Sequence, residues 1–89
     1  MKAIVTVAGK DQVGIIAGVC IKLAEYNVNV LDISQTVMQG YFTMMMATDI
    51  SEANVPLAVL VTEMEAAGKE MGLSIRVQRE DIFEAMHRI

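Results

Sequence analysis

The side chains that commonly carry out catalysis are few in this chain of 89 residues, and they are spread along it. The single histidine, His87, has no cysteine near it in sequence, whereas metal binding and nucleophilic catalysis each require convergent partners. The single cysteine, Cys20, falls on the apolar side of a helical pattern, where a thiol behaves as a small hydrophobic group. We therefore interpret His87 as a solvated surface residue and Cys20 as part of the core.

The 11 acidic residues include no pair whose spacing would place two carboxylates in one cleft, as acid/base catalysis requires. Gly9-Lys10 is not a phosphate-binding loop either, because Gly14 is followed by Ile15-Ile16 and not by lysine and then serine or threonine. The sequence thus predicts no catalytic residue, no metal ligand and no cofactor. It indicates a protein that is not an enzyme.

One segment does have the chemistry of a binding site. Residues 9–15 join a strand-like pattern to a helical pattern, so free N–H groups at the start of the helix would point into a crevice at the end of the strand. Such groups suit a carboxylate. A purely structural interpretation stays open beside this one: Asp11 caps the helix by accepting hydrogen bonds from Val13 or Gly14, and Gly14 allows close packing.

Apolar periodicity predicts the elements that would position this segment. Alternating and β-branched residues predict strands, and amphipathic spacing predicts helices. The expected strands cover 2–8, 28–39, 41–50 and 73–78, and the expected helices run over 13–26, with Asp11 or Gln12 at the N-cap, and from Pro56 in the first turn to just before Gly72. Gln39-Gly40 predicts a two-residue hairpin turn, and the out-of-phase Val30 and Ile33 indicate a bulge near Leu31-Asp32.

The resulting order, βαββαβ, predicts an α+β fold. Right-handed crossovers would place both helices on one face of a four-stranded antiparallel sheet, the ferredoxin-like arrangement. We expect the strand order 4-1-3-2, so that the first and third strands are central. The domain would cover residues 1–80, and residues 81–89 would form a short helical, amphipathic tail that packs on the sheet or on a partner subunit. Close helix packing is expected at the GxxxG of Gly14 and Gly18.

Three consecutive methionines, Met44 to Met46, make the expected third strand apolar on both sides, since neighbouring strand residues point to opposite faces. Two helices cover only one of those faces. We therefore expect a homo-oligomer, with a dimer favoured, and we expect Phe83, Met86 and Ile89 of the tail to dock on the other face.

Composition excludes several classes of partner. The net charge is -4, and the seven lysines and arginines form no basic stripe, which argues against nucleic-acid binding. No apolar run approaches the ~20 residues of a membrane-spanning helix. A single cysteine, and a beginning without a signal-type apolar run, indicate a cytoplasmic protein.

Several short motifs make the chain similar to a known family. Asp11-Gln12-Val13-Gly14-Ile15 resembles the polar-x-Pro-Gly-Val/Ile turn of the ACT domain, and residues 27–30, NVNV, resemble its helix-to-strand element. Within the βαββαβ order, the resemblance covers residues 2–78. Residues 33–37, 41–45 and 82–86 more narrowly resemble stand-alone ACT proteins of bacteria and archaea with no assigned function.

The resemblance implies a regulatory module that binds an amino acid between two domains, through the turn before the first helix and the asparagine that opens the second strand. The implied ligand-binding residues are Asp11, Gln12, Val13, Gly14, Ile15 and Asn29. Asp11 would accept the ligand's ammonium group. Because one helix and two short connections separate Asp11 from Asn29, we expect both to line one crevice. The alternative function is a pure protein–protein assembly module without a small ligand.

Overall fold

Strands and helices follow one another along the chain in the predicted order, which includes a short helix at the end. The computed structural model describes residues 1–86, and at residues 85 and 86 only the backbone. Its elements are β1 (Lys2–Lys10), α1 (Ile15–Glu25), β2 (Asn29–Met38), β3 (Tyr41–Asp49), α2 (Leu57–Met71), β4 (Leu73–Arg79) and α3 (Glu80–Met86).

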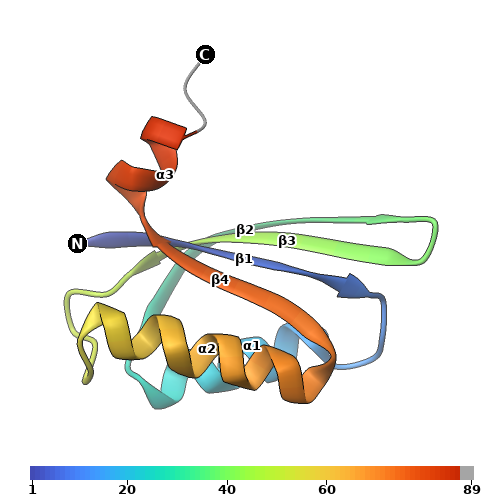
Figure 1. Ribbon diagram of the computed structural model, residues 1–89, viewed down its shortest axis with the longest axis horizontal. Coiled ribbons are helices and arrows are strands. Elements are labelled where there is room, and N and C mark those ends of the chain that lie inside the picture. Colours follow the sequence, from blue (N-terminus) through green and yellow to red (C-terminus); the bar gives the residue numbers. More distant parts are fainter. Residues whose placement is uncertain (87–89) are drawn as a thin grey trace.

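The four strands form one antiparallel sheet in the order β2-β3-β1-β4, which confirms the predicted topology with β1 and β3 in the centre. Both α1 and α2 lie on one side of this sheet (Figure 1). The fold is therefore the ferredoxin-like βαββαβ sandwich. The short α3 rises from the end of β4 on the side opposite to α1 and α2 (Figure 1).

The core lies between the sheet and the two long helices. Alternate residues of each strand point into it because side chains alternate between the faces of a sheet. Helix residues at a spacing of about four reach it from the other side. The largest fully buried residues are Leu23, Met44, Met46, Leu60, Met64, Val5, Val7, Val19 and Thr48.

The connection between β2 and β3 also follows the prediction. Gln39 and Gly40 have φ values of 52° and 82°, which is the conformation that a two-residue hairpin turn requires at both positions. The register shifts between Val30 and Asp32, so Leu31 is the extra residue of a β-bulge.

The beginning of α1 differs from the prediction. The helix starts at Ile15, and no side chain caps it, so the predicted N-cap role of Asp11 or Gln12 is wrong. Gly14 occupies the N-cap position with a left-handed φ of 87°, and Pro56 likewise precedes α2 instead of lying in its first turn. The helix starts two residues later than expected, and its buried stripe consists of Ile15, Val19 and Leu23, whereas Ile16 lies at the surface.

The two glycines of the GxxxG motif have different roles. A Cβ on Gly18 would lie 2.6 Å from Cε of Met71, so α1 packs closely on the end of α2 at this point, as predicted. A Cβ on Gly14 would meet nothing within 4 Å. Gly14 is therefore needed for its positive φ and not for close packing.

The third strand is apolar on both sides, as expected: Met44 and Met46 are fully buried, whereas Met45 on the open face of the sheet is 39% exposed. The described part of the tail, α3, contacts β1 and β4 and leaves Met45 uncovered. The side chain of Met86, and the whole of His87 and Ile89, lie outside the described residues. No helix in residues 1–86 is long and apolar enough to cross a membrane.

Candidate functional site

A groove of about 300 Å³ lies between the start of α1 and the second half of β2. We call it the α1–β2 groove. Its lining consists of Asp11, Gln12, Gly14, Ile15, Ile16, Ala17, Gln35, Val37 and Phe42.

The sheet register explains why these segments meet. β1 runs antiparallel to β3, so its last residue, Lys10, pairs with Tyr41 beside the β2–β3 turn. The chain is fixed there by a hydrogen bond of 2.8 Å from the backbone N–H of Asp11 to the carbonyl oxygen of Gly40. The loop before α1 therefore lies next to the last residues of β2, and among these Gln35 and Val37 line the groove.

The start of α1 supplies hydrogen-bond donors to this groove. The first N–H group of the helix that reaches back to a helical carbonyl is that of Gly18, which donates to Gly14 at 2.9 Å. The N–H groups of Ile15, Ile16 and Ala17 precede it and have no carbonyl one turn earlier within the helix. Because no side chain caps them, they are available to an anion at the positive end of the helix dipole.

The side chains of the groove divide into polar and apolar groups. The carboxylate of Asp11 is exposed and forms no ion pair within residues 1–86. The amide of Gln12 is already engaged, since it donates to the carbonyl of Met71 at 2.8 Å. Ile16 and Val37 are exposed apolar neighbours, and Phe42 is buried. The groove thus combines N–H donors, one carboxylate and an apolar surface.

Four of the six predicted ligand-binding residues line the α1–β2 groove: Asp11, Gln12, Gly14 and Ile15. Val13 is fully exposed and does not. Asn29 lies at the other end of the sheet, where it pairs with Asp49, which in turn pairs with Lys2 at the beginning of β1. The expectation that Asp11 and Asn29 line one crevice within a chain is therefore wrong.

The physical reason is the direction of α1. This helix runs back along the sheet after β1, and it returns the chain to the end at which β1 began (Figure 1). The spacing between Asp11 and Asn29 corresponds to a single helix, and a single helix carries the chain from one end of the sheet to the opposite end.

Asn29 has a charged neighbour in its own chain. The pKa of Asp49 is lowered, chiefly because the hydroxyl of Ser51 donates to its carboxylate at 2.6 Å and the backbone N–H of Ser51 donates at 2.9 Å. Asp49 is therefore ionised at neutral pH. The N-terminal ammonium group of Met1 lies 3.7 Å from the same carboxylate, so Asn29 is next to an ion pair.

Three residues that were not predicted, Gln35, Val37 and Phe42, come from β2 and β3 and line the groove opposite α1. A signal for them existed in the predicted strand order. With the third strand between the first and second, the end of the first strand must meet the turn between the second and third.

Residues 1–86 contain no group of three or more histidine, cysteine or acidic side chains that could hold a metal ion. Cys20 is partly buried and packs against the core, as its place on the apolar side of the helix predicted. The candidate site at the first strand–helix turn is the α1–β2 groove, where N–H donors, a carboxylate and apolar side chains lie together.

The fold and this groove define a small ferredoxin-like domain with a hollow of about 300 Å³ beside its first strand–helix turn. Residues 2–78 match the family model of the ACT domain, and the chain belongs to this family. ACT domains are regulatory modules, and many of them bind amino acids or other small ligands.

Relatives of the same length occur in bacteria and archaea. A UPF0237 protein of Clostridium acetobutylicum is 56% identical over 89 residues, with 100% of both chains covered. A UPF0237 protein of Methanocaldococcus jannaschii is 52% identical over 88 residues, covering 99% of this chain and 98% of the relative. The solved structure of an ACT domain protein from Streptococcus pneumoniae superposes with a TM-score of 0.83, at 48% identity and 98% coverage of each chain.

Proposed function

We propose that this protein is a regulatory module that binds an amino-acid-like ligand in the α1–β2 groove, between two copies of the chain. The observation that carries the proposal is the uncapped start of α1 beside the unpaired carboxylate of Asp11. Together these groups complement the two charges of a zwitterion.

In this binding mode the ligand's carboxylate accepts hydrogen bonds from the first N–H groups of α1, and its ammonium group donates to Asp11. Each charge-assisted hydrogen bond contributes roughly 1.5 to 3 kcal/mol. The ligand's side chain lies against Ile16 and Val37, both of which are exposed in the single chain. A small or medium apolar side chain fits this surface best.

The second copy joins through β2, an edge strand whose free N–H and C=O groups are a template for pairing. Ile33 and Val37 are 39% and 54% exposed on the helix side of β2, an apolar surface that a single chain leaves open. Antiparallel pairing of two β2 strands about Gln35 sets Ile33 opposite Val37 of the second copy. This arrangement buries apolar side chains and opposes no like charges.

The same pairing provides a role for Asn29. With Gln35 at the centre, Asn29 of the second copy reaches the turn at Gln39-Gly40, where Asp11 is hydrogen-bonded. The two polar residues that lie at opposite ends of one chain then meet across the dimer. A site made in this way forms only when two copies associate, which links ligand binding to assembly.

A thermal-shift screen against the twenty amino acids tests for the ligand, because a ligand at ~100 times its dissociation constant adds ~2.7 kcal/mol of stability. With a ligand identified, Asn29→Ala and Asp11→Ala are each expected to abolish or strongly weaken binding. In a mixture of the two variants, each mixed dimer retains one intact site, so calorimetry should recover part of the binding. If the mixture of variants still shows no binding, the site is not shared between copies.

The alternative function, an assembly module without a small ligand, is favoured by one separate observation. The open face of the sheet has a shallow hollow of about 200 Å³ whose lining includes the apolar Ile4, Met45 and Ala47. In this case the C-terminal tail of a second copy docks there. Deletion of residues 81–89 would then lower the melting temperature or change the mass in solution, and a truncated chain unchanged in both would refute it.

A further inference from the structure

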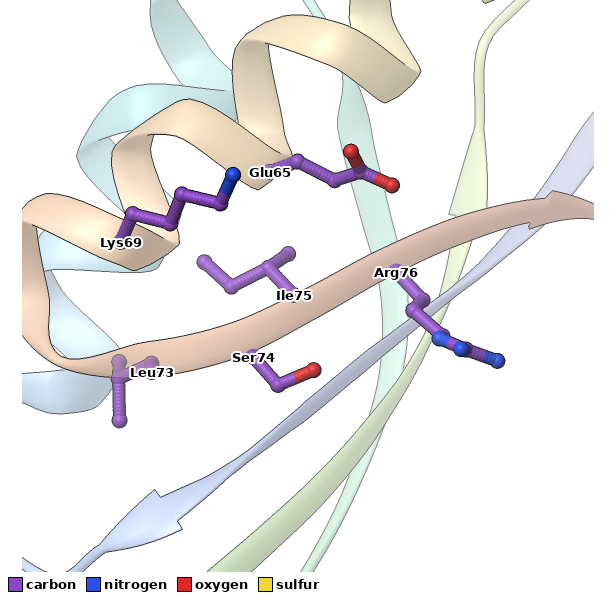
Figure 2. A pocket seen from close by; sticks show the side chains of 6 residues that line it. All are labelled: Glu65, Lys69, Leu73, Ser74, Ile75 and Arg76. Atoms are coloured by element: carbon purple, nitrogen blue, oxygen red, sulfur yellow. The ribbon is translucent and has the colours of Figure 1, made fainter.

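The edge of the sheet that lies farthest from β2 has a groove of its own. Between α2 and the free edge of β4 is a hollow of about 290 Å³, which we call the α2–β4 groove. Figure 2 shows its lining residues, which are Glu65, Lys69, Leu73, Ser74, Ile75 and Arg76. It shares no residue with the α1–β2 groove.

Polar side chains flank this edge on both faces of the sheet. Lys69 and Glu65 project from α2 on one side of β4, and Ser74 and Arg76 project from the opposite side of the strand (Figure 2). This follows from the alternation along β4, in which the buried Leu73 and Ile75 face the helices and the exposed residues between them face away.

The charged groups of the α2–β4 groove have no partners of their own. Among the residues that the structure describes, Glu65, Lys69 and Arg76 form no ion pair. Two cations and one carboxylate give the groove an excess of positive charge. Its lining is therefore complementary to a partner that is, on balance, acidic.

The distribution of these groups over two faces indicates the shape of the partner. A partner that contacts all of these groups must extend across the edge of β4 and reach both faces. A strand added to β4 presents successive side chains alternately to both faces, and its backbone takes up the free hydrogen-bonding groups of the edge. One acidic side chain of such a strand would meet Lys69, and its neighbour in sequence would meet Arg76.

We propose that the α2–β4 groove binds an extended, acidic segment of another protein, which adds to β4 as a further strand of the sheet. The segment carries two adjacent acidic residues, one for Lys69 and one for Arg76. This proposal goes beyond ligand binding and does not depend on it, because the two grooves are made of different residues.

A second copy of this chain is a poorer occupant of the same edge. Arg76 is the middle residue of β4, so symmetric antiparallel pairing of two β4 strands would set the two Arg76 side chains opposite each other. Like charges directly opposite on neighbouring strands are destabilising. The polar residues Ser74 and Arg76 on the exposed face also provide no apolar surface for self-association.

The test uses the whole chain and a blocked hexapeptide of composition Val-Thr-Glu-Glu-Val-Thr, with a matched peptide in which lysine replaces both glutamates. Titration followed by amide NMR should give saturable shifts along residues 73–79 with the acidic peptide. The double variant Lys69→Glu, Arg76→Glu should weaken that binding at least tenfold and should bind the lysine peptide instead. Both positions are exposed, so the variant should fold, and circular dichroism checks this.

The double variant Lys10→Glu, Lys22→Glu serves as the matched control, because it also reverses two cations and both lie outside the groove, on β1 and α1. It should alter the affinity by less than twofold. Three results would overturn the proposal: no shifts at millimolar peptide, shifts along residues 29–38 in place of β4, or equal affinity for the two peptides. Each leaves amino-acid binding in the α1–β2 groove unaffected, since that binding is measured separately by calorimetry.

Discussion

The side-chain amide of Gln12 donates a hydrogen bond of 2.8 Å to the backbone carbonyl of Met71, the last residue of α2. This bond ties the loop that lines the α1–β2 groove to the point where α2 gives way to β4. The side chain of Met71 meanwhile lies over Gly18 of α1. The two grooves are thus connected through the short joint from Met71 to Leu73.

Replacing Gln12 by alanine should destabilise this joint. We expect Gln12→Ala to lower the free energy of unfolding by about 1 kcal/mol, because the carbonyl of Met71 loses its donor. Urea denaturation measures the loss, and hydrogen exchange at the end of α2 should become faster. Gln12→Glu keeps the size but not the donor, so a Gln12→Glu protein as stable as the unchanged chain would contradict this role.

Gly14 should tolerate asparagine better than alanine. Its φ of 87° is left-handed, and a Cβ there would meet no atom within 4 Å, so the cost of a substitution is conformational strain alone. Gly14→Ala should lose roughly 1 to 2 kcal/mol, and Gly14→Asn should lose less, because asparagine enters this conformation more readily. Thermal and urea unfolding of both variants provide the comparison. Equal losses would indicate that packing, and not strain, determines the residue at this position.

A charge on the helix side of β2 should separate the proposed dimer. Ile33→Lys places a lysine opposite Val37 of the second copy, where a cation would be buried without a partner. We expect the mass measured by light scattering to fall from dimer toward monomer. Ser74→Lys makes a comparable change on the other edge of the sheet and should leave the mass unaltered. A dimer that survives Ile33→Lys but not Ser74→Lys would mean that the copies meet at β4.

Asp49 should make stability depend on pH on the acidic side. Hydrogen bonds from Ser51 lower the pKa of Asp49 in the folded protein. Its stabilisation is therefore present above the unfolded pKa of about 3.9, and it is lost as the pH falls through the lower folded pKa. The unchanged chain should melt at a higher temperature than Asp49→Asn at neutral pH, and the difference should shrink as the pH falls below the unfolded pKa of about 3.9. A difference that is constant with pH would exclude ionisation as the cause.

Much of the fold could be predicted from the sequence because its signals are local. Alternation along residues 73–78, the turn residues Gln39-Gly40 and the phase change around Leu31 each reflect neighbours in the chain. The right-handedness of the two crossovers then restricts the sheet to very few strand orders. The described structure has the predicted one.

The residues of the candidate site also divide into those that local sequence brings together and those that it does not. Asp11, Gly14 and Ile15 belong to one loop between a strand and a helix, so the sequence alone places them together, and the tertiary structure confirms this grouping. Gln35 and Phe42 reach the groove only because β3 lies between β1 and β2. Their proximity depends on pairing between strands that are far apart in sequence. Local sequence patterns do not reveal such pairing.

Two residues show why tertiary structure was needed even within the predicted site. Gln12 lies where the sequence predicts a helix N-cap. Its side-chain amide instead donates a hydrogen bond to the backbone carbonyl of Met71, at the end of another helix. Asn29 is separated from Asp11 by the length of the sheet, because α1 runs in the direction opposite to β1. The sequence by itself determines which residues can bind a ligand and which strand, helix or loop contains each of them. The direction and pairing of the strands and helices decide which of those residues meet. These are set by the tertiary structure, because all the strands and helices must bury their apolar faces in one shared core.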